Sequence, residues 1–225
     1  MSRKKISTHF ILGTAQLCAD YGVNNKRGKQ TLESATSFLD YAISSGTKIL
    51  DTASSYDGAY RVIENSKKII PKKFFIIDKV SSQEVENYEK FKSALHWPWL
   101  DKFSYKGGQV CLMLHNGKDY LDKNTRKSLQ KCRDEGLVSN IGISVYETTC
   151  LEKCLSLGGL DVIQIPLSLA DRRFAANKIK KKLKVNRISV HVRSVFLQGL
   201  LLSSPVNLSE NFDKYKIKFN DYLKL

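Results

Sequence analysis

Short apolar runs alternate with longer amphipathic stretches along almost the whole chain, and this alternation restricts the possible fold more than any other feature. The amphipathic stretches repeat apolar residues at helical spacing, and several end at a glycine or a proline. The apolar runs are short and nearly continuous, which is typical of parallel strands with both faces covered. Seven runs are predicted to be strands: 9–15, 48–53, 73–80, 109–116, 140–145, 161–169 and 188–201.

Seven strands joined by helical connections predict a (β/α)8 TIM-type barrel. An open doubly wound sheet is less favoured, because residues 13–22 after the first strand lack a glycine-rich phosphate-binding fingerprint. Barrels of this kind take about 250 residues, whereas this chain has 225. Residues 203–225 are predicted to form a loop and an amphipathic helix. Residues 1–225 are therefore expected to be a single barrel domain, shortened at the C-terminus and lacking the eighth strand.

A barrel without its last strand has two open edges, on the first and seventh strands. Proteins normally pair or cover such edges. We expect either the last helix or another chain to fill the gap, so an oligomer is one of two alternatives.

The chain is strongly basic, with Lys+Arg 37 against Asp+Glu 22 and a formal net charge of +15. Such a charge fits nucleic acid, an anionic membrane surface or phosphorylated ligands. The lysines are spread over many predicted helices, which favours a solvated exterior. The lysine cluster at 180–184 has no interleaved aromatic residue or glycine to stack on bases. No specific nucleic-acid partner is predicted, and polyanion binding through this cluster is kept as a weaker alternative.

The cysteines and the N-terminus predict a cytoplasmic protein. Five cysteines form no secreted disulfide pattern and indicate reduced thiols. Cys150 and Cys154 fall on one face of a predicted helix, where burial as small apolar residues is favoured over metal binding. No segment reaches the length of a membrane span. The basic N-terminus makes a poor signal peptide, because Gly13 and Gln16 break its short apolar stretch.

Ionisable residues end three consecutive predicted strands. Asp51, Lys79 and His115 end the second, third and fourth strands, and Tyr56 follows in the loop after the second. Each alone has an ordinary explanation, as a helix cap, a solvated lysine, or a histidine satisfied in the core. Neighbouring barrel strands, however, end side by side at the rim where active sites lie. We therefore expect these four residues to form one unit.

The four side chains have complementary chemistry. A tyrosine with a pKa near 10 exchanges protons poorly at neutral pH, and a nearby ammonium lowers its pKa by favouring the phenolate. Asp51 would keep Lys79 charged and oriented, and His115 would donate a hydrogen bond to a bound carbonyl oxygen. A weaker alternative makes Lys79 the Schiff-base lysine of a barrel aldolase.

Six motifs occur in an order and spacing typical of a known family: LGTAQ (12–16), ILDTASSY (49–56), the lysine of IIDKV (76–80), LMLHN (112–116), EGLVSNIGIS (135–144) and VIQIPLSLAD (162–171). From Phe10 to about Leu202, the chain resembles the aldo-keto reductase family. The segment 193–202 is similar to a bacterial branch whose members often lie among cell-surface polysaccharide genes.

The resemblance implies an oxidoreductase that transfers a hydride from NADPH to an aldehyde or ketone. Carried over to this sequence, it implies Tyr56 as general acid, Lys79 and Asp51 as the pair that tunes its pKa, and His115 as the residue that orients the substrate. The expected substrate is a small carbonyl compound, with a sugar-related one as a candidate. Trp97 and Trp99 would suit packing against a sugar, although a core role is as well supported.

The resemblance also implies contacts to the cofactor. Ser144 and Gln164 match the residues that hold the nicotinamide carboxamide, although polar filling of the barrel interior also explains them. Val145 stands where many members have asparagine. Arg193 replaces a ring that stacks on the nicotinamide, which a guanidinium plane can also do, and Ser194 matches a pyrophosphate contact.

The motif that binds the 2′-phosphate and adenine in the family, a lysine-serine followed by an arginine, is absent from this sequence. Each lost charge-assisted contact weakens binding by about 1.5–3 kcal/mol. Two functions therefore stay open. The first is an NADPH-dependent carbonyl reductase, and the alternative is a shortened, non-catalytic relative that binds a ligand or a partner.

Overall fold

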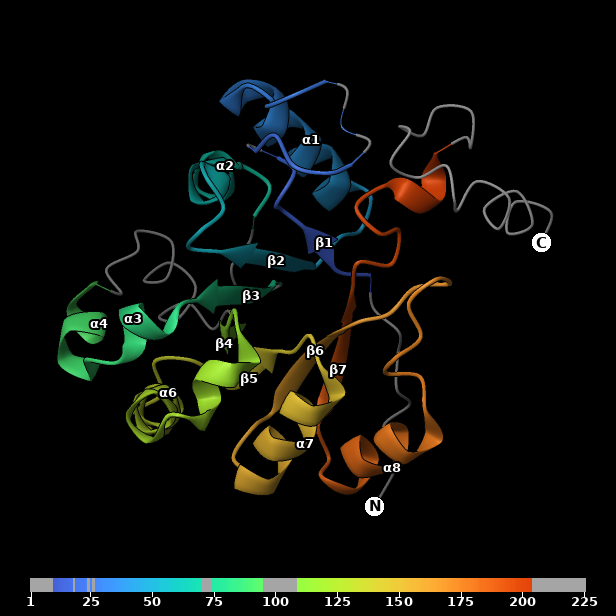
Figure 1. The fold of residues 1–225 in the computed structure, drawn as a ribbon. Helices are drawn as coiled ribbons and strands as arrows, with labels where there is room; N and C mark the ends of the chain where they lie inside the picture. Colours follow the sequence, from blue (N-terminus) through green and yellow to red (C-terminus); the bar gives the residue numbers. More distant parts are fainter. Residues whose placement is uncertain are drawn as a thin grey trace, which may run out of the picture.

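The computed structural model describes residues 10–17, 19–23, 25, 27–69, 74–94 and 109–203. Seven parallel strands form one sheet in which the spatial order is the sequence order (Figure 1). The sheet curls so that helices lie on its outer side. The strands are β1 (Leu12–Gly13), β2 (Ile49–Ala53), β3 (Phe75–Val80), β4 (Gln109–Leu114), β5 (Asn140–Ser144), β6 (Val162–Pro166) and β7 (Ser189–Arg193).

The helices follow the strands in the expected alternation. They are α1 (Leu32–Ser44), α2 (Ala59–Asn65), α3 (Ser82–Val85), α4 (Tyr88–Ala94), α6 (Lys123–Asp134), α7 (Thr148–Leu157) and α8 (Asn177–Val185), with 3-10 helices η2 (Gly117–Leu121) and η3 (Leu200–Leu202). None of the helices in the described part of the chain is long and apolar enough to cross a membrane.

Local signals in the sequence set the helix ends. Thr31 caps α1 by accepting a hydrogen bond from the Ser34 amide, and Asp122 caps α6 in the same way through the Thr125 amide. Helix α2 ends at Asn65, because Ser66 is extended and its hydroxyl donates to Asp40 of α1 (2.5 Å).

The last strand is shorter than the range 188–201 predicted from the sequence. β7 ends at Arg193, and the chain then turns through Ser194, Leu197 and Gln198, which all have positive φ. Non-glycine residues seldom adopt this conformation. The apolar residues at 195–201 therefore lie beyond the end of the sheet, in a turn and in the start of η3.

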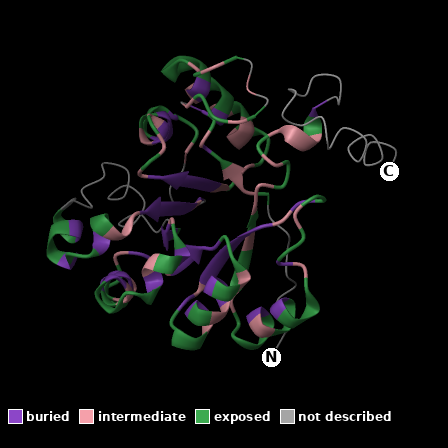
Figure 2. Cartoon of the chain, viewed as in Figure 1, coloured by how far each residue is buried: buried purple, intermediate pink, exposed green. Residues whose placement is uncertain are grey.

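Strand alternation divides the sheet into two faces. Leu50, Ile76 and Leu112 belong to the large core cluster that includes the buried helix residues, and Figure 2 shows the central strands as buried. Ile77 and Met113 belong to a smaller cluster on the opposite, inner face. Asp51 is in register with Ile77, and Lys79 with Met113, so both charged residues belong to the inner face.

The described part of the sheet is not closed. β1 pairs with β2 and β7 with β6, and no described strand joins β1 to β7. On β7, Val190 and Val192 are each 40% exposed. The prediction of a TIM-type barrel without its eighth strand is confirmed for these residues. Residues 204–225, which include the predicted last helix, lie outside the described part, so the assignment of 1–225 to one domain and the closure of the gap stay predictions.

The predicted burial of Cys150 and Cys154 on one helix face is confirmed. Cys150 and Cys154 of α7 are buried, with 3.9 Å between their sulfur atoms, and Cys111 and Cys132 are buried free thiols. Cys18 lies outside the described residues.

Asp78 of β3 is a fully buried carboxyl that faces the helices. The Tyr60 hydroxyl of α2 donates to its Oδ1 (2.9 Å), and its Oδ2 has no hydrogen-bond partner among the described residues. Burial raises the pKa of Asp78 to about 8. The folded protein therefore holds a proton at neutral pH that the unfolded chain releases.

We expect this proton to make stability fall as the pH rises from about 5 to 8. Between the unfolded and folded pKa values the native state binds more protons, so the free energy of unfolding decreases by about 1.4 kcal/mol per pH unit from this group. Asp78→Asn should remove that slope, as measured by urea unfolding at several pH values. Asp134→Asn, at an exposed aspartate, is the control. An unchanged slope in Asp78→Asn would contradict the assignment.

Candidate active site

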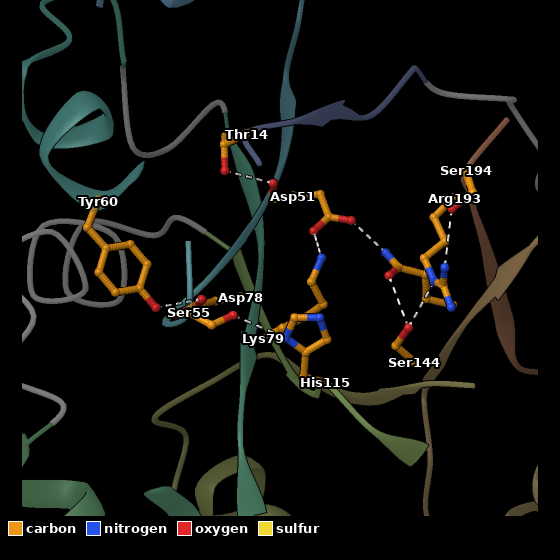
Figure 3. Close-up of polar contacts among 11 residues, drawn as sticks. Thr14, Asp51, Ser55, Tyr60, Asp78, Lys79, His115, Ser144, Arg193 and Ser194 are labelled. Atoms are coloured by element: carbon orange, nitrogen blue, oxygen red, sulfur yellow. Dashed lines mark hydrogen bonds and ion pairs between the residues drawn. The ribbon is translucent and has the colours of Figure 1, made fainter. Parts of the chain in front are cut away.

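A buried ion pair between β2 and β3 lies at the centre of the site. The Lys79 ammonium donates to Oδ1 of Asp51, and the two residues are 3% and 8% exposed (Figure 3). Adjacent strands and matching alternation bring them together on the inner face. The carboxylate compensates a charge that would otherwise be costly to bury.

Tyr56 lies in the turn after β2, beside this pair. The Lys79 ammonium is 5.2 Å from the centroid of the Tyr56 ring. Burial, followed by the charge of Asp51, raises the pKa of Tyr56 far above its usual value. This differs from the lowering that the sequence predicted. In the structure the ammonium is bound to Asp51 and faces the ring of Tyr56, and no described hydrogen bond joins it to the hydroxyl.

His115 follows β4 and faces Tyr56 edge-on, with 6.0 Å between ring centroids and 86° between ring planes. Its Nδ1 lies 3.4 Å from the Ser55 hydroxyl. Burial and then the charge of Lys79 lower the pKa of His115, so the imidazole is neutral at pH 7. When Ser55 donates to Nδ1, the ring proton is on Nε2, where it can be donated to a ligand.

A chain of hydrogen bonds crosses the inner face from Asp51 to β7. The Gln164 amide donates to Asp51 Oδ2 (2.6 Å), the Ser144 hydroxyl donates to Gln164 Oε1 (3.3 Å), and Arg193 Nε donates to Ser144 Oγ (3.2 Å). Figure 3 shows these links. The Gln164 contact was not predicted, because β6 and β2 are not neighbours and no local pattern reports a contact between them.

The Arg193 guanidinium is held on several sides. It donates to the Ser194 hydroxyl (3.2 Å) and to the Val145 carbonyl (3.4 Å), in addition to Ser144. The Tyr146 ring packs against one face of the guanidinium, with 4.1 Å between the guanidinium carbon and the ring centroid. Tyr146 was missed by the sequence reasoning, although its place directly after the fifth strand could have indicated a rim residue.

One cavity of about 610 Å³ joins these groups. It also touches β1 and the turn after β7. The structure brings all eight predicted site residues to its lining: Asp51, Tyr56, Lys79, His115, Ser144, Gln164, Arg193 and Ser194. Trp97 and Trp99 lie outside the described residues.

A second cavity of about 440 Å³ shares two lining residues with the first, His115 and Tyr146. Its other lining residues include Lys118 and Glu147, whose charged groups are 3.0 Å apart. The rim thus offers space on the β4 and β5 side of the site.

Comparisons with known proteins identify the family and agree with the fold. The model of the Aldo/keto reductase family matches residues 9–220. A search of curated protein sequences finds no match. Among solved structures, the holo form of aldo-keto reductase AKR11C1 from Bacillus halodurans has a TM-score of 0.67 and 20% identity, over 86% of this chain and 64% of that one.

Two further structures are similar. Glycerol dehydrogenase AKR11B4 from Gluconobacter oxydans has a TM-score of 0.65 and 16% identity, over 95% of this chain and 72% of that one. Aldo-keto reductase AKR2E5 in complex with NADPH has a TM-score of 0.56 and 20% identity, over 82% of this chain and 58% of that one. At these identities the likeness shows the fold, and the chain spans less than two thirds of the AKR11C1 length. With the family model matched over residues 9–220, the chain belongs to the aldo/keto reductase family.

Proposed function

We propose that this protein reduces an aldehyde or ketone with NADPH, and that Tyr56 is the proton donor. The observation that carries the proposal is the cavity in which the Asp51–Lys79 ion pair lies against Tyr56 and His115, with Ser144 and Gln164 beside them. Family membership supports a nicotinamide cofactor and a carbonyl substrate.

Tyr56 is protonated at neutral pH, because burial keeps its pKa high. It is therefore in the form that a general acid needs when the carbonyl oxygen gains negative charge. In the proposed step the Lys79 ammonium, near the Tyr56 ring, would favour the phenolate that is left after proton transfer, against the effects of burial and of Asp51. The ion pair with Asp51 occupies the Lys79 ammonium, which opposes the aldolase alternative, since a Schiff-base lysine attacks as a free neutral amine.

His115 supplies a second hydrogen bond to the carbonyl oxygen. Its imidazole is neutral, so it can donate from one nitrogen while Ser55 occupies the other. A donor aimed at the developing oxyanion stabilises the transition state more than the ground state. His115 thereby orients the substrate and leaves proton transfer to Tyr56.

The donors and acceptors of Ser144 and Gln164 fit the carboxamide of a nicotinamide, and the planar guanidinium of Arg193 fits its ring. Ser194 would contact the pyrophosphate. When bound, NADPH supplies the hydride. Ser144 and Gln164 would exchange part of their mutual hydrogen bonding for the carboxamide. A sugar-related substrate, an oligomer and a cytoplasmic location also stay predictions.

NADPH binding is the first test of the proposed function. We expect titration with the protein to change NADPH fluorescence, with a dissociation constant on the order of micromolar to tens of micromolar. Gln164→Leu should weaken binding about tenfold, the equivalent of one hydrogen bond. Gln83→Leu, at an exposed position on α3, is the matched control. No binding at about 1 mM would reject the reductase and favour a non-catalytic binding module.

A further inference from the structure

The described lining of the 610 Å³ cavity carries one positive charge that no ion pair neutralises. Among the described residues that line it, the charged ones are Asp51, Lys79 and Arg193. Asp51 and Lys79 neutralise each other in their ion pair, and His115 is neutral because burial lowers its pKa. The remaining charge is that of Arg193, so the cavity favours an anionic ligand.

No described carboxylate neutralises Arg193. Asp171 is near enough for its pKa to respond to Arg193, but it is bound by Arg173 through two hydrogen bonds of 2.9 and 2.8 Å. The contacts of Arg193 itself are to two hydroxyls and a backbone carbonyl, which are neutral acceptors. Because its described hydrogen-bond partners are all neutral, this half-buried guanidinium keeps a positive charge that an anionic ligand can pair with.

The guanidinium is also fixed in a geometry suited to an oxyanion. A guanidinium has five N–H donors, and three nitrogens of Arg193 use one each on Ser144, Ser194 and Val145. Counting the described contacts only, one N–H on each terminal nitrogen remains for a ligand. The Tyr146 ring packs on one face of the guanidinium, 4.1 Å from its central carbon. A pair of free donors on a fixed plane matches the two oxygens of a carboxylate.

Arg193 lies within electrostatic reach of the groups that would act on the carbonyl. Burial raises the pKa of Tyr56 and Arg193 opposes that rise, whereas burial, Lys79 and Arg193 all act on His115 to lower its pKa. All three side chains line the same cavity. An anion at Arg193 and a carbonyl at Tyr56 can therefore belong to one small molecule.

We propose that Arg193 binds a carboxylate of the substrate and selects keto acids or aldehyde acids over neutral carbonyl compounds. This inference rests on the proposed function, because it names the substrate class of the same site. A phosphate of the cofactor has the same oxyanion chemistry, and the experiment must separate these two sources.

The kinetic arm compares 4-carboxybenzaldehyde with its neutral methyl ester. We expect the native protein to prefer the acid, mainly through a lower KM. Arg193→Met should reduce the ratio of kcat/KM for acid over ester by about 100-fold, and Arg193→Lys should retain part of the preference, because a lysine keeps the charge but not the paired donors. A loss of cofactor affinity in the variant lowers kcat/KM for both substrates equally, so it cancels in the ratio. Arg61→Met, on the exposed side of α2, controls for net charge.

The equilibrium arm needs no turnover. Calorimetry should show that benzoate binds the native protein more tightly than benzamide does, and that Arg193→Met removes the difference. An unchanged acid-to-ester ratio in Arg193→Met, or equal binding of benzoate and benzamide, would overturn the inference while leaving carbonyl reduction intact. A loss of NADPH affinity in Arg193→Met without a change in the ratio would overturn the inference and assign the residue to the cofactor, through its nicotinamide ring or its phosphate. Absence of NADPH binding would reject the proposed function, while benzoate binding would still decide the inference.

Discussion

Tyr56→Phe is expected to lower kcat for aldehyde reduction by about 10³-fold, within the range for loss of a general acid. The substitution removes only the hydroxyl and retains the ring that lies near Lys79 and His115. His115 cannot readily replace it, because its lowered pKa makes the imidazolium scarce at neutral pH. The measurement is single-turnover reduction with saturating NADPH.

Tyr41→Phe is the matched control for this variant, since Tyr41 is 72% exposed on α1. It should retain native kcat. A loss of less than about tenfold in Tyr56→Phe would mean that another group or water delivers the proton.

Lys79→Met is expected to lower the free energy of unfolding by about 3–5 kcal/mol and to abolish measurable reduction. It leaves the Asp51 carboxylate buried, with the Gln164 amide and no cation to neutralise it. Urea unfolding measures the stability, and NADPH oxidation measures the activity. The double variant Asp51→Asn with Lys79→Met should recover much of the stability, because it buries neutral groups, but none of the activity.

Lys131→Met provides the control for a surface ion pair. Lys131 lies on α6, where it pairs with Glu89 and Glu135, and it is 47% exposed. Its loss should cost less than about 1 kcal/mol. If Lys79→Met destabilised no more than Lys131→Met, the Asp51 carboxylate could not be buried without a counter-charge in that variant.

Together, the two variants separate chemistry from architecture. Tyr56→Phe tests a group whose removal should change the rate and leave the fold intact, whereas Lys79→Met tests a group that supports both. A loss of activity in Lys79→Met has meaning only alongside the stability of the double variant, since an unfolded site is also inactive.

The relation between sequence and site differs from residue to residue. Asp51, Lys79 and His115 could be predicted because they lie on adjacent strands towards their C-terminal ends, or directly after them, and strand order follows sequence order. Tyr56 follows β2 after a short turn, so it was expected at the same rim of the sheet. The strand predicted over 188–201 was too long, because the apolar character of the segment gave no sign of the positive φ values after Arg193.

The sequence by itself determined the alternation of strands and helices and the residues that gather at the rim, because these depend on local periodicity and on chain order. Only the tertiary structure decided how the side chains meet across the barrel. Gln164 reaches Asp51 from a strand that is distant in sequence, Tyr146 supports Arg193, and burial raises the pKa of Tyr56 instead of lowering it. Hydrogen bonds and desolvation depend on distances through space and on the surrounding medium, which strand periodicity does not encode.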